Sequence, residues 1–378
     1  HRVGHEDCDE LAVLPAGAEA LTPILELEPG EAVADPVHDG RGHLLFERTV
    51  AQPAVWAVGF DAEALTCTGP AFLVAAPART PTVARDGSLL YAPAREPLAT
   101  ELVWADRAGA VLETLGPAFE ARVWGLRLAP DDGQVAFTAD RGDESELWTL
   151  DLTTGARTRH LVQRDGWVMP IAWTPSSDAL IYMRRDEAGE ETGLLALDGS
   201  GISHRFGPNS RPWALLSDGR RVVREVPNVP GDPRGGDSYV ISAIDGSGTS
   251  RRFLSGPGDK GYFELSPDDE LVVYASDEEG SRELYMTRFP DGTGRWLLVA
   301  DAAAWPTWTA AGDELLCSVD ERVLSVPIVR TDEDVQVGVA RELFDGREVG
   351  LTPSSGFGVT ADGQRVVALH PLATDEAL

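Results

Sequence analysis

Positive charge is scarce in this sequence, and lysine is almost missing. The 378 residues carry 62 Asp and Glu against 32 Lys and Arg, and the formal net charge at pH 7 is −30. Lys260 is the single lysine. A surface this acidic repels phosphate backbones and anionic lipid headgroups. We therefore expect neither nucleic acid nor a membrane surface as a partner, and we expect cationic or neutral ligands to be favoured.

Long apolar segments are also missing. The sequence has no stretch of about 18 apolar residues, so we expect no membrane insertion by this chain. Residues 1–10 are polar and charged and have no signal-peptide pattern. The sequence opens on His1 rather than Met, which is compatible with a removed leader or preceding domain. The compartment therefore stays open.

Cysteine is rare. Cys8, Cys67 and Cys317 cannot all pair within the chain, and their spacing matches no metal knuckle. We expect them to be small apolar residues of strands. We predict neither a metal site nor a cofactor.

A short turn motif recurs eight times, each time between two apolar runs. Its spacing of 42 to 51 residues is the length of one β-propeller blade. Asp-Gly pairs supply the positive φ that tight hairpins require, and a preceding Pro fixes φ. The turns are 37–40, 84–87, 129–132, 174–177, 216–219, 266–269, 310–312 and 360–363.

Each repeat predicts a blade of four antiparallel strands. The turn joins the first two strands, and the second is an apolar run without alternation, which indicates burial on both faces. After a polar loop comes a third strand, for example 146–151 or 283–288. A glycine turn then leads into a more polar fourth strand.

The eighth repeat has room for only two strands, because its turn lies 15 residues from the C-terminus. Residues 9–28 have the pattern of a third strand, a turn and a fourth strand. We therefore predict an all-β fold, a single eight-bladed β-propeller domain of four-stranded antiparallel blades over residues 1–378. Strands from 9–28 and 356–371 would share one blade and close the ring, which leaves no unpaired edge.

Several of these segments resemble a known family. Residues 128–141 with 146–148, and residues 265–277, resemble the WD40-like repeats of TolB-type β-propellers. The closest resemblance is to the propeller that follows the kinase domain in many bacterial eukaryotic-like serine/threonine kinases, with landmarks at 42–61, 101–109 and 294–296.

This resemblance implies a bacterial sensor or protein-binding domain, an extracytoplasmic or periplasmic location, and a kinase domain before His1 that is missing from this chain. The residues contain no kinase signature. TolB itself has six blades and an additional N-terminal domain. We find neither in the sequence pattern, so the partners of TolB are not carried over.

Motifs that suggest other chemistry have structural explanations. Residues 256–261 have dinucleotide-binding spacing but lack a following helix, so we predict an inter-blade loop. No Gly-x-Ser-x-Gly elbow occurs. His38 and His370 would lie in inner blade positions, and we expect them to be structural. The acidic loops 140–146, 186–191 and 277–279 could bind Ca²⁺ weakly, but solvated hairpin tips are the expected state.

Aromatic residues stand at or before the start of the innermost strands. This position is near the loops at one mouth of the channel, where aromatic rings can stack on a ligand or anchor a peptide. The same rings can equally pack between blades. The candidate ligand- or partner-binding residues are Trp124, Trp167, Trp213, Tyr262, Trp305 and Phe357.

We predict a non-catalytic binding or sensing propeller that recognises a protein segment or a small ligand at the channel mouth, and we expect no catalytic residue. One alternative is an enzyme with an active site in the channel, such as a polysaccharide lyase or hydrolase. Another is the detached propeller of a prolyl-oligopeptidase-like peptidase. A channel plugged with side chains would favour a purely structural scaffold.

Overall fold

The structure is a computed structural model that divides into two compact units, His1–Glu96 and Pro97–Leu378. Each unit has its own sheets and its own apolar cores. The residues that the structure describes are 10–14, 22–26, 32–49, 53–76, 78–84, 86–93, 99–141, 144–186, 189–207, 211–226, 238–247, 249–300, 303–331 and 334–372.

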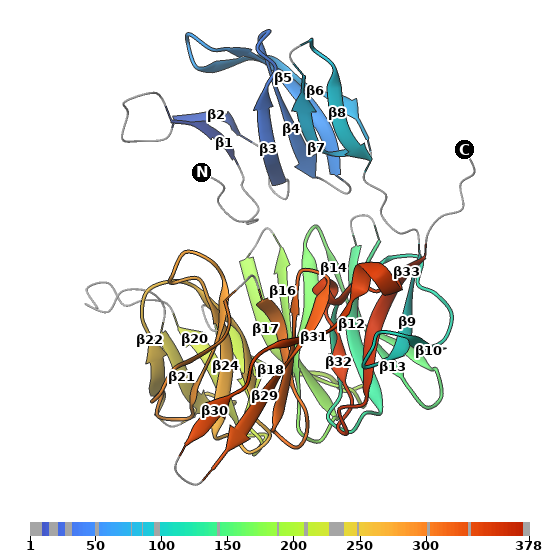
Figure 1. The fold of residues 1–378 in the computed structure, drawn as a ribbon, viewed down its shortest axis with the longest axis vertical. Helices are drawn as coiled ribbons and strands as arrows, with labels where there is room; N and C mark the ends of the chain where they lie inside the picture. The colour runs from blue at the N-terminus through green and yellow to red at the C-terminus, as the bar shows by residue number, and fades with distance from the viewer. Residues whose placement is uncertain are drawn as a thin grey trace. The chain divides into compact units, whose positions relative to one another are not determined.

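The described part of the second unit forms six antiparallel sheets (Figure 1). The first is β11 (Arg122–Leu128), β12 (Gln134–Arg141), β13 (Glu144–Asp151) and β14 (Arg157–Arg164). The second is β15 (Trp167–Trp173), β16 (Ala179–Asp186), β17 (Gly189–Ala196) and β18 (Gly201–Arg205). The third is β19 (Arg211–Leu215), β20 (Arg221–Val226), β21 (Ser238–Ala243) and β22 (Arg251–Ser255).

The fourth sheet is β23 (Lys260–Leu265), β24 (Leu271–Ser276), β25 (Glu283–Arg288) and β26 (Trp296–Val299). The fifth is β27 (Ala303–Trp308), β28 (Glu314–Val319) and β29 (Arg322–Arg330), which pairs with both β30 (Val335–Val337) and β31 (Arg341–Asp345). The short helices α1 (Gly346–Val349) and η1 (Pro353–Ser355) follow. The sixth sheet has the order β10-β9-β33-β32, from β9 (Ala99–Asp106), β10 (Val111–Thr114), β32 (Gly358–Val359) and β33 (Arg365–Leu372).

The inner strands of these sheets follow one another around a ring. β11 contacts β15, β15 contacts β19, β19 contacts β23, and β23 contacts β27. β27 contacts β32, and β32 contacts β11 again. Antiparallel sheets arranged radially in such a cycle form a β-propeller. The six inner strands therefore surround the central channel of the ring.

The ring closes through the sheet that combines both ends of this unit. β33 pairs with β9 in eight consecutive residue pairs, from Arg365 opposite Asp106 to Leu372 opposite Ala99. β10 covers the outer side of β9, and β32 covers the inner side of β33. The unit thus joins its own first and last strands.

This closure corrects the prediction of one eight-bladed ring over residues 1–378. Residues 356–371 were expected to pair with 9–28, whereas β33 pairs with β9, and β1 (Glu10–Val13) pairs with β2 (Thr22–Glu26). The strand at 99–106 has the same kind of apolar pattern as the strand at 10–14, so the sequence pattern alone cannot distinguish the two partners. Repeats of the same appearance on both sides of residue 96 also hide the unit boundary.

The turn after each inner strand keeps one geometry despite its variable sequence. The φ angle is 58° at Asp132, 58° at Ser177, 57° at Asp269 and 67° at Gly312. Departures from Pro-Asp-Gly therefore leave the turn intact. In the second sheet, the hydroxyls of Thr174 and Ser176 each donate to Oδ1 of Asp178 at 2.7 Å, which supports the turn without glycine.

The apolar cores of the second unit lie between neighbouring sheets. The cluster between the fourth and fifth sheets contains Val273, Met286, Leu315 and Val326, all fully buried. Every residue of β24 is buried. This confirms that apolar runs without alternation belong to strands covered on both faces.

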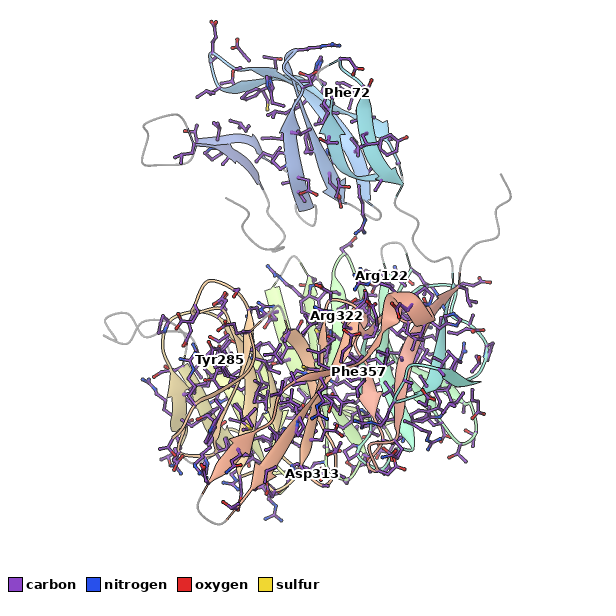
Figure 2. The ribbon with its side chains drawn as sticks, viewed as in Figure 1. Phe72, Arg122, Tyr285, Asp313, Arg322 and Phe357 are labelled. Carbon is purple, nitrogen blue, oxygen red and sulfur yellow. The ribbon has the colours of Figure 1, made fainter. Side chains whose placement is uncertain are left out.

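The first unit contains one four-stranded sheet of β3 (Ala32–His38), β4 (His43–Thr49), β5 (Pro53–Asp61) and β6 (Thr66–Ala75). Leu11 of β1 packs on one face of it, in a cluster with Phe46. Ala78 of the hairpin formed by β7 (Ala78–Val83) and β8 (Leu89–Pro93) packs in a cluster with Leu45. This unit therefore has one complete blade and, in β1–β2 and β7–β8, two half blades. Phe72 on β6 is 51% exposed (Figure 2).

Candidate functional site on the inner strands

The six inner strands can be aligned by the hydrogen bond that closes the turn after each of them. In every case a backbone N–H donates to the carbonyl oxygen five residues later. We call its donor the anchor residue. The anchor residues are Ala129, Thr174, Leu216, Ser266, Thr309 and Thr360.

The predicted aromatic residues do not share one position relative to these anchors. Trp213 and Phe357 lie three residues before the anchor, and Tyr262 and Trp305 lie four before it. Trp124 lies five before the anchor, and Trp167 lies seven before it. The recurrence seen in the sequence is therefore a recurrence of residue type and not of structural position.

Burial separates these residues further. Phe357 is 1% exposed and Trp305 is 6% exposed, and both belong to the core between the fifth and sixth sheets. Phe357 lies inside the second unit, whereas Arg122 and Asp313 lie at its opposite ends (Figure 2). We call the end marked by Arg122, where the inner strands begin, the start face. The end marked by Asp313 is the turn face.

Trp124 and Trp167 form a partly exposed pair near the start face. Their rings meet edge to face with centroids 6.5 Å apart and planes at 69°. Nε1 of Trp124 donates to Oδ2 of Asp140 at 2.6 Å, and the hydroxyl of Ser145 donates to Oδ1 at 2.7 Å. Burial raises the pKa of Asp140, and these two hydrogen bonds oppose the rise. The Trp124 ring is thus fixed while part of its surface reaches solvent.

Trp213 stands apart from that pair. Its Nε1 donates to Oε2 of Glu225 at 3.1 Å, and its ring lies 6.2 Å from that of Phe263. It packs at the edge of the core between the third and fourth sheets. The structure therefore brings together Trp124 with Trp167, and separately Tyr262 with Trp305, but not all six residues.

Tyr262 and Trp305 have strained backbones. Their φ angles are 52° and 53°, in the left-handed region that bulky residues rarely adopt. Each stands in a β-bulge, where the register of the inner strand shifts. Their ring centroids are 5.3 Å apart, and Nε1 of Trp305 donates to the carbonyl oxygen of Ser354 at 2.8 Å. Strain of this kind persists only where the surrounding structure holds it.

Two charged residues that sequence reasoning missed lie at one level of the ring. Arg127 of β11 and Glu264 of β23 each stand two residues before the anchor. The guanidinium carbon of Arg127 lies 4.7 Å from the ring centroid of Trp305, and its Nε donates to the carbonyl oxygen of Ile171 at 2.9 Å. These contacts to β27 and β15 place the Arg127 side chain inside the ring.

Glu264 is desolvated by the protein around it. This burial raises the pKa of its carboxyl from the usual 4.5 to about 7, and the charge of Arg127 opposes the rise. Burial also lowers the pKa of Arg127, and the charge of Glu264 opposes this. Both residues nevertheless keep part of their surface accessible. Deep location with residual access is what the lining of an internal channel produces.

We expect Glu264→Gln to change stability in a pH-dependent way. A carboxyl with a higher pKa in the folded than in the unfolded state destabilises the fold once ionised, so its contribution is lost as pH rises from about 4.5 through 7. At pH 8 the free energy of unfolding of the variant, measured by urea denaturation, should exceed that of the parent by about 1–2 kcal/mol after allowance for channel water. At pH 4.5 the variant and the parent should have the same free energy of unfolding. Glu270→Gln, at a side chain 75% exposed, is the control. An equal difference at both pH values would contradict the expectation.

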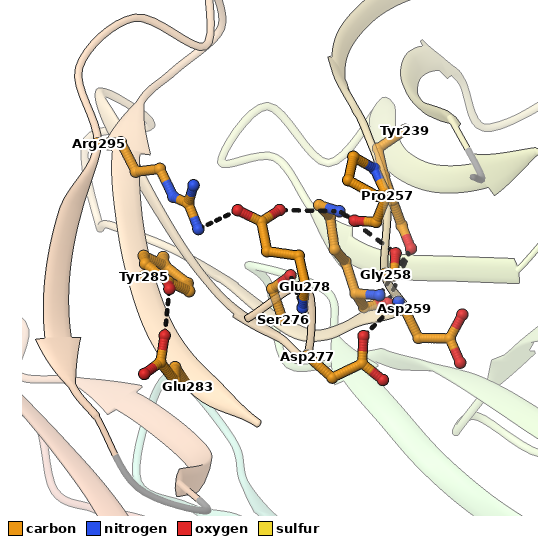
Figure 3. A network of polar contacts seen from close by, with 11 residues as sticks. Tyr239, Pro257, Gly258, Asp259, Ser276, Asp277, Glu278, Glu283, Tyr285 and Arg295 are labelled. Atoms are coloured by element: carbon orange, nitrogen blue, oxygen red, sulfur yellow. Dashed lines mark hydrogen bonds and ion pairs between the residues drawn. The ribbon is translucent and has the colours of Figure 1, made fainter. Parts of the chain in front are cut away.

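The glycine-rich segment 256–261 is an inter-blade connection, as predicted, because it links β22 to β23. Lys260 within it is buried, and its Nζ donates to the carbonyl oxygens of Pro257 at 2.6 Å and Gly258 at 3.3 Å. Nζ also lies 3.6 Å from Glu278, which pairs with Arg295 (Figure 3). Burial lowers the pKa of Lys260, while Glu278 opposes this. The only lysine of the sequence therefore stabilises the loop before β23 by hydrogen bonds to its backbone.

In the described ranges, no group of three or more His, Cys, Asp or Glu residues could hold a metal ion. Nδ1 of His370 lies 3.7 Å from Glu101 within the sixth sheet, and His38 lies against Phe60 in the first unit. These two histidines thus belong to different units.

Cys317 is buried, which raises its pKa to about 12, and Cys67 is half-buried. Cys8 lies outside the described residues.

Among the described residues, no helix is long and apolar enough to cross a membrane.

No family model and no curated protein matches this chain. Among solved structures, a TolB of Agrobacterium tumefaciens is 16% identical with a TM-score of 0.52, over 73% of this chain and 99% of its own. TolB from Acinetobacter baumannii is 12% identical with a TM-score of 0.48, over 90% of this chain and 78% of its own. An oligogalacturonate lyase in complex with manganese is 12% identical with a TM-score of 0.41, over 96% of both chains.

Only the first of these likenesses reaches a TM-score at which folds can be compared, and at 16% identity it concerns the fold alone. The share of this chain that it covers is close to the share that the second unit occupies. The finer resemblance to kinase-attached propellers stays a prediction, since none of these three structures is described as one. The chain contains a β-propeller whose fold is similar to that of a TolB structure.

Proposed function

We propose that the second unit is a non-catalytic binding module that recognises a protein segment through Trp124 and Trp167 at its start face. The observation that supports this most directly is the partly exposed, edge-to-face ring pair on adjacent inner strands. Aromatic side chains bury a large area with few rotatable bonds, which is why they dominate binding surfaces. Trp305 and Phe357 are core residues and contribute to this function only by supporting the ring.

The charge of the protein favours neutral or basic segments as partners. The net charge of −30 attracts cations and repels anionic chains over the whole surface. In addition, Asp140 accepts from Nε1 of Trp124 and therefore places negative charge next to the ring pair. An aromatic surface beside a carboxylate suits an apolar side chain flanked by Lys or Arg.

A defined peptide library tests the proposal. Dodecapeptides displayed on phage are selected against the full chain, and the recovered peptides are synthesised and titrated. We expect neutral or basic sequences whose affinity falls at least about tenfold in the double variant Trp124→Ala/Trp167→Ala, as for aromatic hot spots. Circular dichroism verifies that the variant is folded.

Trp296→Ala is the matched control, because Trp296 is also half-buried but lies on the outer strand β26. Its affinity should equal that of the parent. Recovery of peptides that bind the folded double variant as tightly as the parent would refute the proposal, and so would a failure to recover any specific peptide.

A further inference from the structure

One level of the ring differs from the others in the size and charge of its side chains. Two residues before the anchor, four of the six inner strands carry small residues, and the other two carry Arg127 and Glu264. The small residues are Ala172, Ala214, Thr307 and Gly358. The strands β11 and β23 are three steps apart in a cycle of six, so the two charges stand on opposite sides of the ring.

The donors of Arg127 are only partly used. Its Nε donates to Ile171, and the face of its guanidinium lies against Trp305. Among the described residues, none accepts a hydrogen bond from its Nη1 or Nη2. Neither atom is among the sealed, unsatisfied polar atoms of this part of the chain, so both remain accessible.

The carboxylate of Glu264 also lacks a hydrogen-bond partner among the described residues. It accepts no hydrogen bond and forms no ion pair with any described residue, and its oxygens are not sealed from solvent. Its charge interacts with that of Arg127, yet the two residues form no ion pair with each other. Unpaired charges inside a protein are costly, and a ligand that carries a charge of each sign would serve both groups.

The surroundings of Arg127 are aromatic. Tyr262 and Trp305 approach each other in strained bulges two residues earlier on their strands, and the guanidinium of Arg127 lies over the Trp305 ring. Met169 of β15 packs against the same cluster as these two rings. An occupant would therefore meet a donor group, an acceptor group and an apolar wall.

We propose that this level of the channel binds a small zwitterion of the α-amino acid type, with its carboxylate on Arg127 and its ammonium on Glu264. A carboxylate can accept from both free guanidinium nitrogens, and an ammonium can donate to Glu264. A lone cation would be repelled by Arg127, and a lone anion would be repelled by Glu264. The site is separate from the Trp124–Trp167 pair, so either proposal can fail without the other.

Calorimetric titration of the full chain with matched small molecules tests this site. The probes are glycine, L-leucine and L-phenylalanine, which share both charges, and N-acetyl-L-leucine and 3-methylbutylamine, which each keep one. We expect at least one of the three amino acids to bind, and L-leucine to bind at least tenfold more tightly than either of its singly charged analogues. No binding by any amino acid, or equal binding of L-leucine and an analogue, would overturn the proposal.

Two variants then assign the charges. Glu264→Gln should remove the preference for L-leucine over N-acetyl-L-leucine, and Arg127→Met should remove the preference over 3-methylbutylamine. Glu270→Gln and Arg288→Met are controls, because Glu270 is 75% exposed and Arg288 stacks on Trp296 outside the channel. Amino acid binding that survives both channel substitutions would also overturn the proposal. The comparison of probes on the parent protein decides the question if either variant fails to fold.

Discussion

Replacing Val103 by proline is expected to open the ring of the second unit. Val103 is fully buried in β9, where it pairs with Ala368 of β33 on one side and with Thr114 of β10 on the other. Proline has no N–H for the ladder, and its ring does not fit the centre of a sheet. We expect a loss of about 3 kcal/mol or more in the free energy of unfolding. Urea denaturation followed by tryptophan fluorescence measures it, since all tryptophans except Trp56 belong to this unit.

Leu112→Pro is the matched control within the same sheet. Leu112 is 55% exposed in β10, the outermost strand, and stands at the bulge where the register between Val111 and Glu113 shifts. Edge strands and bulges tolerate proline. Its unfolding midpoint should stay near that of the parent. Equal midpoints for both proline variants would mean that the pairing of β9 with β33 does not hold the ring together.

Phe357→Ala is expected to destabilise the second unit by about 3–5 kcal/mol, the range for deleting a buried aromatic side chain. Phe357 is 1% exposed and packs in one cluster with Trp305 and Leu316. The cavity would lie where the inner strand of the sixth sheet meets the fifth sheet. Urea denaturation at constant pH gives the magnitude, and peptide or amino acid binding should be lost only in proportion to unfolding.

Leu297→Ala provides the comparison for that substitution. Leu297 is 48% exposed on the outer strand β26, so its truncation should change stability by no more than about 0.5 kcal/mol. If Phe357→Ala also changed stability so little, Phe357 would not be a packing residue. Its original interpretation as a ligand contact would then be the better one.

The strands and turns of a single blade could be predicted because they depend on residues close together in the sequence. Apolar runs, turn residues and a more polar fourth strand specify a four-stranded blade within a single repeat, and the structure contains such sheets. Even the irregular turn at Ser177 obeys the pattern, because the side chain of Asp178 supports it. These features depend on neighbours within a few residues.

The closure of the ring could not be predicted in the same way. The choice between residues 10–14 and 99–106 as partner of β33 depends on contacts between distant segments, and both candidates have a suitable apolar pattern. Repeats alone therefore count blade-sized segments without showing which of them form one ring. The two half blades of the first unit look like ordinary repeats in the sequence.

The candidate site was anticipated only in part. Tryptophans are easily identified as candidates in a sequence. Their positions along the inner strands become clear only from the anchor hydrogen bonds, which place Trp124 and Trp305 at different levels of the ring. Arg127 and Glu264 are ordinary surface residue types. The signal that could have found them is their position, two residues before the turn in strands whose counterparts there carry Ala, Thr or Gly.

The sheet that joins the ends of the second unit also determines how the unit responds to mechanical force. Ala99 and Leu372 lie opposite each other at the same end of the antiparallel pair. Tension applied between these two residues would load the ladder one hydrogen bond at a time, like a zip, rather than shearing all eight residue pairs together. The junction that secures the ring against thermal opening therefore resists a pull between these two residues less than it would resist a shearing pull.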